Sequence, residues 1–162
     1  MPGPLCERAI ADALESGNAL LKFISPNDAG ATASHQCGFY LPHKAWRLYS
    51  PAPPQDGVNF KHQVTIRWQD QLTTRSVVTW YGQRTRHEFR LTRFGRGFPH
   101  FGSDAVGNLL VLVPRSSDRF NAYILESEED IEEIQAALGV EVHGSWGILA
   151  RDGAVDPEAE AS

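Results

Sequence analysis

Apolar residues recur along the chain with two periods, and these periods predict where helices and strands lie. A helical spacing near the N-terminus predicts a helix over Leu5–Ser16 that ends at Gly17, and its apolar positions are Leu5, Ile10, Ala13 and Leu14. Ser127 followed by three acids is typical of a capped helix start, and predicts a second helix that ends at Leu138.

Shorter apolar runs, several of them alternating with polar residues, predict strands. We expect them at Ala19–Ile24, Val58–Trp68, Thr73–Tyr81, His87–Arg93, Leu109–Val113, Phe120–Leu125 and Val140–Leu149, with a further apolar run at Phe39–Pro42 and a helical turn over Lys44–Tyr49. Many short strands with two helices near the ends predict a mainly β fold with flanking helices, of the barrel or pseudobarrel kind.

The segments between these elements set the expected domain limits. Ser25–Gly38 is rich in small and polar residues and has no apolar period, which favours a long ordered loop or an arm. The end of the chain is rich in Ala, Glu, Asp and Pro, as a linker is. We therefore expect one domain over residues 1–150 and, over 151–162, an acidic tail or the start of a linker.

The distribution of charge along the chain is more informative about function than the net charge. The formal net charge is −5, which by itself argues mildly against nucleic acid. Between Arg67 and Arg96, however, there are seven arginines and only two acids. Because salt screens charges beyond about 10 Å, a domain that is acidic overall can still present a basic face.

Other features narrow the function class. The sequence has no apolar stretch of membrane-spanning length, no signal-peptide pattern, and two cysteines without a CxxC pair, so we expect a cytoplasmic protein with no membrane partner. The lysines lack the acidic neighbours of a magnesium-dependent nuclease, and no nucleotide-binding glycine motif is present. We therefore expect no catalytic residues, no metal and no cofactor in this chain.

Two segments carry residues suited to reading base edges. The first runs from Asn27 to Pro42 and has Asn27, Asp28, His35 and Gln36 among small residues. Amides can bind adenine and a carboxylate can accept from cytosine, although a plain turn-rich loop has the same composition. The second runs from Arg84 to Gly97, and an extended strand there would place Glu88, Arg90 and Thr92 on one side, joined by Arg86 if the strand starts early. A solvated strand face is the structural alternative, which the excess of arginines disfavours.

These segments resemble the N-terminal effector domain of the EcoRII-type restriction endonucleases. The resemblance lies in Asn-Asp-x-Gly-Ala-Thr-x-x-His-Gln-x-Gly-x-Tyr-aliphatic-Pro over 27–42 and Arg-x-Thr-Arg-aromatic-Gly-Arg-Gly over 90–97, in the expected order and at a similar spacing. It is clear from about Phe23 to Gly97. It implies a DNA-binding pseudobarrel like that of a plant transcription-factor family, with two arms that enter the major groove, over Ser25–Tyr40 and Gln83–Arg93.

The resemblance also implies a site and a role. Family members read CCWGG, where W is A or T, and their magnesium-dependent nuclease lies in a separate, later domain. The residues it carries over are His35, Tyr40, Arg84, Arg86, Glu88 and Arg90. Phe89 stands where a basic residue is expected, and Arg84 replaces a lysine. With the neighbouring side chains, the expected DNA-binding set is Asn27, Asp28, His35, Gln36, Tyr40, Arg84, Arg86, His87, Glu88, Arg90, Arg93 and Arg96.

Two other classes of function stay open on the residues alone. One is a small enzyme that uses His35 with Asp28 or Glu88 in a barrel mouth, and the other is a protein-interaction module whose arms grip a partner. The absent lysine–carboxylate constellation disfavours the enzyme, and the arginine row disfavours the interaction module. The interpretation that we favour is a DNA-binding domain whose partners are double-stranded DNA and a covalently linked nuclease.

Overall fold

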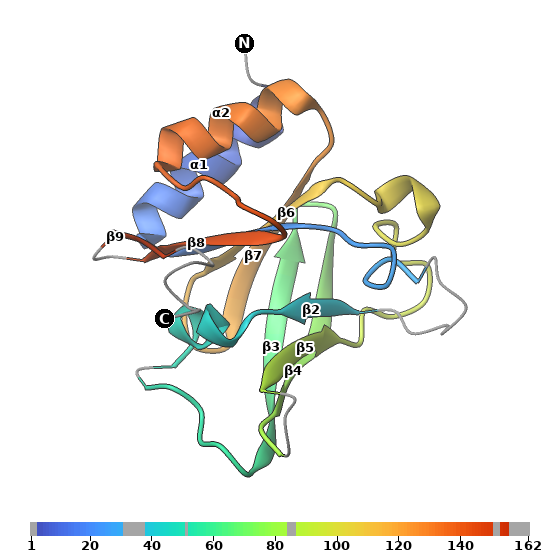
Figure 1. The fold of residues 1–162 in the computed structure, drawn as a ribbon. Helices are drawn as coiled ribbons and strands as arrows, with labels where there is room; N and C mark the ends of the chain where they lie inside the picture. Colours follow the sequence, from blue (N-terminus) through green and yellow to red (C-terminus); the bar gives the residue numbers. More distant parts are fainter. Residues whose placement is uncertain (1–2, 31–37, 51, 84–86, 151–152, 156–162) are drawn as a thin grey trace.

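The chain folds into a curled sheet with two helices packed on one side (Figure 1). The computed structural model describes residues 3–30, 38–50, 52–83, 87–150 and 153–155. Its helices are α1 (Pro4–Ser16) and α2 (Glu128–Leu138), with short 3-10 helices η1 (His43–Leu48) and η2 (Ser103–Ala105). Its strands are β1 (Ala19–Phe23), β2 (Phe39–Leu41), β3 (Asn59–Trp68), β4 (Leu72–Tyr81), β5 (Glu88–Thr92), β6 (Leu109–Pro114), β7 (Arg119–Leu125), β8 (Trp146–Ala150) and β9 (Gly153–Val155). No helix in this part of the chain is long and apolar enough to span a membrane.

One parallel contact joins two antiparallel halves of the sheet. In the described residues the strand order is β2-β5-β4-β3-β7-β6-β1-β8-β9. Only β3 and β7 pair in parallel, with Ile66 opposite Phe120, and the other neighbouring pairs are antiparallel. The mainly β prediction with flanking helices is therefore confirmed, and the curl of the sheet is that of a pseudobarrel.

Two apolar cores explain why the strands have different sequence patterns. Inside the curl, Leu20, Leu112 and Phe89 belong to one cluster built from both halves of the sheet. A second cluster, which includes Leu21 and Val111, lies between the sheet and the two helices. Strands between the two cores are buried on both faces, so β6 is an unbroken apolar run. The strand β5 has one buried face, so it alternates.

Both predicted helices are present, and local chemistry fixes their ends. Gly17 and Gly139 follow the last turns of α1 and α2 in the left-handed conformation, which glycine adopts without steric cost. The Ser127 hydroxyl accepts a hydrogen bond from the Asp130 amide at 3.1 Å, as the sequence predicted for a capped start.

The C-terminal segment differs from the sequence prediction. The strand expected over Val140–Leu149 is only Trp146–Ala150, because Gln135 of α2 binds the amides of Val140 and Val142 instead. Beyond it, Gly153–Val155 forms β9, which pairs with β8.

The Asp28 carboxylate ties three parts of the fold together. Asp28 and Lys22 of β1 are both buried, and their side chains form an ion pair. The Asp28 carboxylate also accepts from the Ser25 amide at 3.1 Å and from the Tyr40 amide of β2 at 2.9 Å. The loop after β1 is thereby attached to both β1 and β2.

The aromatic loop after β5 supports the same region. Phe94 and Phe101 lie 5.5 and 5.4 Å from Phe39 of β2, measured between ring centroids. His100 stacks on Trp68 at 5.8 Å, and no hydrogen-bond partner among the described residues reaches its buried Nε2. Burial lowers the pKa of His100 below its ordinary value, against a smaller opposing effect of the Glu126 charge.

Removal of the Asp28 carboxylate will destabilise the fold. In Asp28→Ala, the Lys22 ammonium stays buried without its counter-ion, and we expect the free energy of unfolding to fall by about 3–5 kcal/mol. Urea denaturation will measure the loss. Asp104→Ala, at an exposed position of η2, is the matched control and should stay within about 0.5 kcal/mol of wild type. Equal stabilities of the two variants would contradict this role.

Acid will destabilise the aromatic loop through His100. Because the folded-state pKa of His100 is lowered, the unfolded chain binds the proton more readily once the pH falls below 6.5. The contribution of His100 to stability is thus present above that pH and is lost below it. We expect His100→Phe to flatten the fall in melting temperature between about pH 7.5 and about pH 5.5. An unchanged pH dependence in the variant would refute the assignment.

Candidate nucleic-acid interface

The strand β5 separates a core face from a polar outer face. Phe89 and Leu91 are fully buried, whereas Glu88, Arg90 and Thr92 are partly exposed. This confirms the expected alternation in the second candidate segment. The two helices pack on the other half of the sheet, over β1, β6 and β7 (Figure 1), so they do not cover β5.

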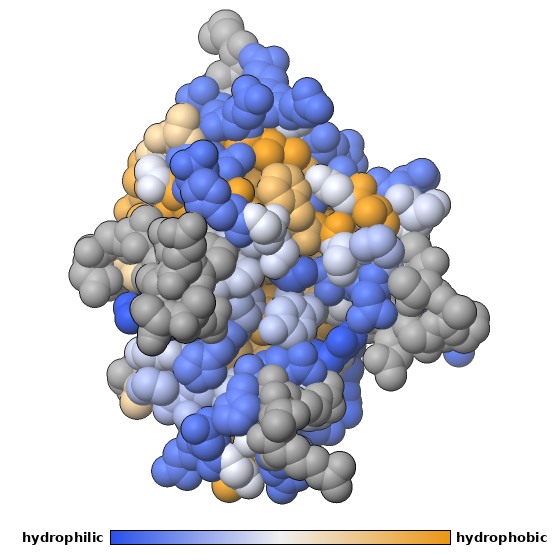
Figure 2. All heavy atoms as spheres, in the orientation of Figure 1, coloured by the Kyte–Doolittle hydropathy of each residue, from blue (hydrophilic) through white to orange (hydrophobic). Residues whose placement is uncertain are grey.

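Strand pairing brings the first candidate segment next to the second. Tyr40 of β2 is opposite Arg90, and Arg90 is opposite Thr79 of β4, which in turn is opposite Lys61 of β3. Because directly paired residues project from the same face of a sheet, these side chains form one row across four strands. In the orientation of Figure 2, hydrophilic residues cover most of the face on which β2 and β5 lie.

The base of the second expected arm is tightly built. The Asn59 side-chain oxygen accepts from the amides of Gly82 and Gln83 at 3.0 and 3.2 Å. A Cβ atom at Gly82 would lie 2.4 Å from the carbonyl oxygen of Val58, so only glycine fits there. On the other side of the arm, His87 Nδ1 lies 2.9 Å from the Asp56 carboxylate. The chain therefore enters and leaves this arm at fixed points.

The base of the first expected arm is fixed as well. The Gly38 amide donates to the Asp28 carbonyl at 3.2 Å, which closes the segment between them. A Cβ atom at Gly38 would lie 2.9 Å from the Leu91 carbonyl and 3.8 Å from an Arg90 guanidinium nitrogen. The base of the first arm thus contacts the strand that carries the second.

One expected DNA contact is corrected by this geometry. The sequence suggested that Asp28 faces DNA and accepts from a cytosine. In the structure Asp28 is 0% exposed, and its carboxylate binds Lys22 and two backbone amides. Its role is to hold the arm from inside, because a buried carboxylate with these partners has no access to a base. The neighbouring Asn27 is exposed, as a contact residue must be.

The remaining candidates fall into two groups. Arg93 and Arg96 are exposed after β5, in the loop that holds Phe94 and Phe98. His87 and Arg93 bracket β5 with left-handed backbone at φ values of 46° and 68°, which non-glycine residues adopt rarely and often at functional sites. The other four lie outside the described residues, and they are His35, Gln36, Arg84 and Arg86.

Sequence reasoning missed the contribution of β3 and β4 to this face. Lys61 and Thr79 join the row of Tyr40 and Arg90 only through pairing of strands. The alternation of Val58–Trp68 could have placed Lys61 on an outer face, since Val64, Ile66 and Trp68 are buried. It could not have indicated that this face continues that of β5.

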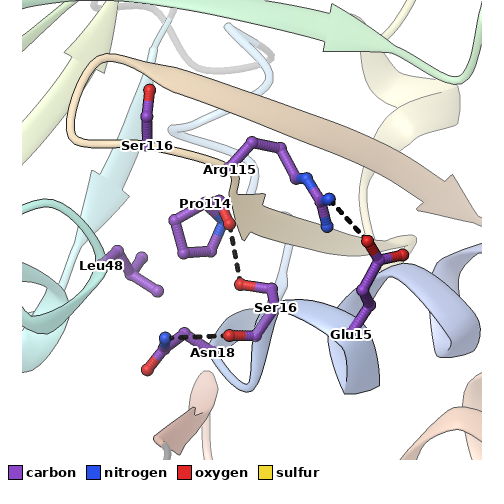
Figure 3. Close-up of a pocket in the computed structure, with 7 residues that line it drawn as sticks. All are labelled: Glu15, Ser16, Asn18, Leu48, Pro114, Arg115 and Ser116. Carbon is purple, nitrogen blue, oxygen red and sulfur yellow. Dashed lines mark hydrogen bonds and ion pairs between the residues drawn. The ribbon is translucent and has the colours of Figure 1, made fainter.

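A pocket elsewhere on the molecule is held by structural contacts. It is lined by residues from the end of α1 and from the β6–β7 turn, where Arg115 pairs with Glu15 at 3.0 Å and the Ser16 hydroxyl donates to the Pro114 carbonyl (Figure 3). None of the expected DNA-binding residues lines it. Within the described residues, no group of three or more His, Cys, Asp or Glu side chains is placed to hold a metal ion.

Comparison with known proteins identifies the family. No curated protein matches the sequence. The sequence model of the family described as "Restriction endonuclease EcoRII, N-terminal" matches residues 13–146, which span the sheet from β1 to the start of β8 and include both expected arms. The chain therefore belongs to the EcoRII N-terminal family, the DNA-recognition effector domains of restriction endonucleases.

Proposed function

We propose that this chain recognises a CCWGG-like site in duplex DNA through two major-groove arms and directs a linked nuclease domain to it. The observation that carries the proposal is the pairing of Tyr40 with Arg90, which sets the bases of both expected arms on one polar part of the sheet that the two helices leave uncovered. Family membership supports the DNA-recognition role, and the arrangement of the outer face supports the arms as the reading elements.

The outer face of β5 has the chemistry that base reading needs. A guanidinium can bind the O6 and N7 of guanine in two hydrogen bonds, and a carboxylate can accept from the N4 amino group of cytosine. Arg90 and Glu88 alternate with the buried Phe89, so both project from one face, about 7 Å apart along the strand. Tyr40 in the neighbouring strand is suited to a phosphate, which sets orientation without reading sequence.

In this proposal the domain binds DNA and the linked nuclease domain cleaves it. Recognition by hydrogen bonds to bases and phosphates requires no metal ion. We therefore propose that this domain binds DNA without a cofactor, and that magnesium serves only the nuclease domain.

Binding to DNA will be specific and independent of magnesium. In gel-shift titrations at fixed salt, we expect the chain to bind a CCWGG duplex more tightly than a scrambled duplex, equally with magnesium and with chelator. Plasmid nicking by the pure chain that a chelator abolishes would show an enzyme instead. Equal affinity for both duplexes would show that the arms do not read this site.

Glu88→Ala will separate base reading from general DNA affinity. Loss of one base contact typically costs about 1–3 kcal/mol on the specific site, and we expect that loss on the CCWGG duplex. Affinity for the scrambled duplex should stay or rise, because a negative charge leaves the interface. Glu132→Ala, an exposed acid on α2, is the matched control and should alter neither affinity. An equal change in affinity for both duplexes would show that Glu88 does not contact a base.

A further inference from the structure

A polar groove continues the outer face of the sheet from the end of the second expected arm. Its lining includes Gln63 and Thr65 of β3, Arg75 of β4, Arg93 after β5, and Asp118 from the β6–β7 turn. Thr65 pairs with Arg75 and Gln63 with Val77, and Val77 pairs with Thr92 of β5. The groove therefore lies on the same face as Arg90, at the C-terminal end of β5, where the second expected arm ends. We call it the flank groove.

A buried hydrogen-bond chain fixes one wall of the flank groove. The Trp68 indole donates to the Thr74 hydroxyl at 2.9 Å, and the Thr74 and Ser76 hydroxyls are bonded at 2.9 Å. Ser76 then donates to the Arg93 carbonyl at 2.8 Å. Arg93 has the left-handed φ of 68°, a conformation that surrounding contacts must hold in place. These hydrogen bonds therefore fix the position of the Arg93 backbone, and with it the origin of the Arg93 side chain.

The charges of the flank groove favour an anion. The side chains of Arg75 and Arg93 are exposed, and neither has a carboxylate partner among the residues that the structure describes. Arg119 adds a third cation on this face, since it pairs with Thr65 across the parallel contact. Among the described residues that line the groove, the one acid is Asp118, which accepts from the Ser116 hydroxyl at 2.9 Å. Two arginines that line one groove can each donate hydrogen bonds to phosphate oxygens.

The position of the flank groove suits a duplex already held by the arms. From Thr79, which is opposite Arg90, to Arg75 there are four residues of extended strand, a length of about 13 Å. That length matches the rise of about four base pairs. A duplex that runs along β4 with its bases at Arg90 would therefore bring phosphates about four base pairs away within reach of the groove.

We propose that the flank groove binds the phosphate backbone of the duplex outside the recognition site, with Arg75 and Arg93 as its contacts. This inference rests on the proposed DNA-binding function. It adds to it a sequence-independent contact by Arg75 of β4, which lies outside both expected arms, next to Arg93 at the end of the second arm. The affinity of the domain thereby depends on the length of DNA around its site.

The test compares two CCWGG duplexes, one that ends just beyond the site and one with a further helical turn on each side. For the long duplex, Arg75→Ala should weaken binding and make the slope of log affinity against log salt less negative by about 0.9, the value for one phosphate contact. On the short duplex it should change neither. Asp118→Asn keeps the hydrogen bond from Ser116 and removes a negative charge, so it should strengthen binding of the long duplex alone.

Each outcome decides between explanations. Arg8→Ala removes an equal charge from α1 and should leave both duplexes unaffected. If Arg75→Ala weakens short and long duplexes equally, Arg75 contacts the site or supports the fold, and the flank groove is refuted. If Arg75→Ala weakens binding of neither duplex while the wild type still prefers CCWGG, the proposed function is supported and the flank-groove proposal is refuted. If wild type binds no duplex, both fall together.

Discussion

The buried ion pair of Lys22 and Asp28 is the contact on which the candidate interface depends. Asp28 binds β1 through Lys22 and β2 through the Tyr40 amide, so one carboxylate joins the two halves of the sheet beside the first arm. Burial of a charge is unfavourable unless it is paired and hydrogen-bonded, and Asp28 meets both conditions. The same contacts that satisfy the carboxylate therefore give the first arm a fixed origin.

Buried and partly exposed residues alternate along β5, so its outward-facing side chains are held in place by the core on its other face. Phe89 and Leu91 are part of the core and cannot move without opening it, so Glu88 and Arg90 are held on the opposite face. Base recognition needs side chains that are already in position, because ordering them on binding costs affinity. A core strand is thus a better support for such residues than an isolated loop.

Local charge matters more here than the total. The chain carries a net charge of −5, yet three acids of α2 lie in its first turn, where the helix dipole favours them, and α2 belongs to the helical layer over β1, β6 and β7. The cations Lys61, Arg75 and Arg90 lie on β3, β4 and β5, in the other half of the same curled sheet. A domain with separated charges of this kind can attract a polyanion to one region of its surface and leave the other unattractive to it.

The sequence by itself determined the local structure: the ends of both helices, and the alternation that sets Arg90 apart from Phe89. Capping and periodicity are properties of neighbouring residues, so they can be read along the chain. Only the tertiary structure decided that Asp28 is internal, that Tyr40 lies beside Arg90, and that Lys61 and Arg75 extend the same face. Those facts depend on which strands pair, and alternation specifies the face of a residue without specifying its neighbour across the sheet.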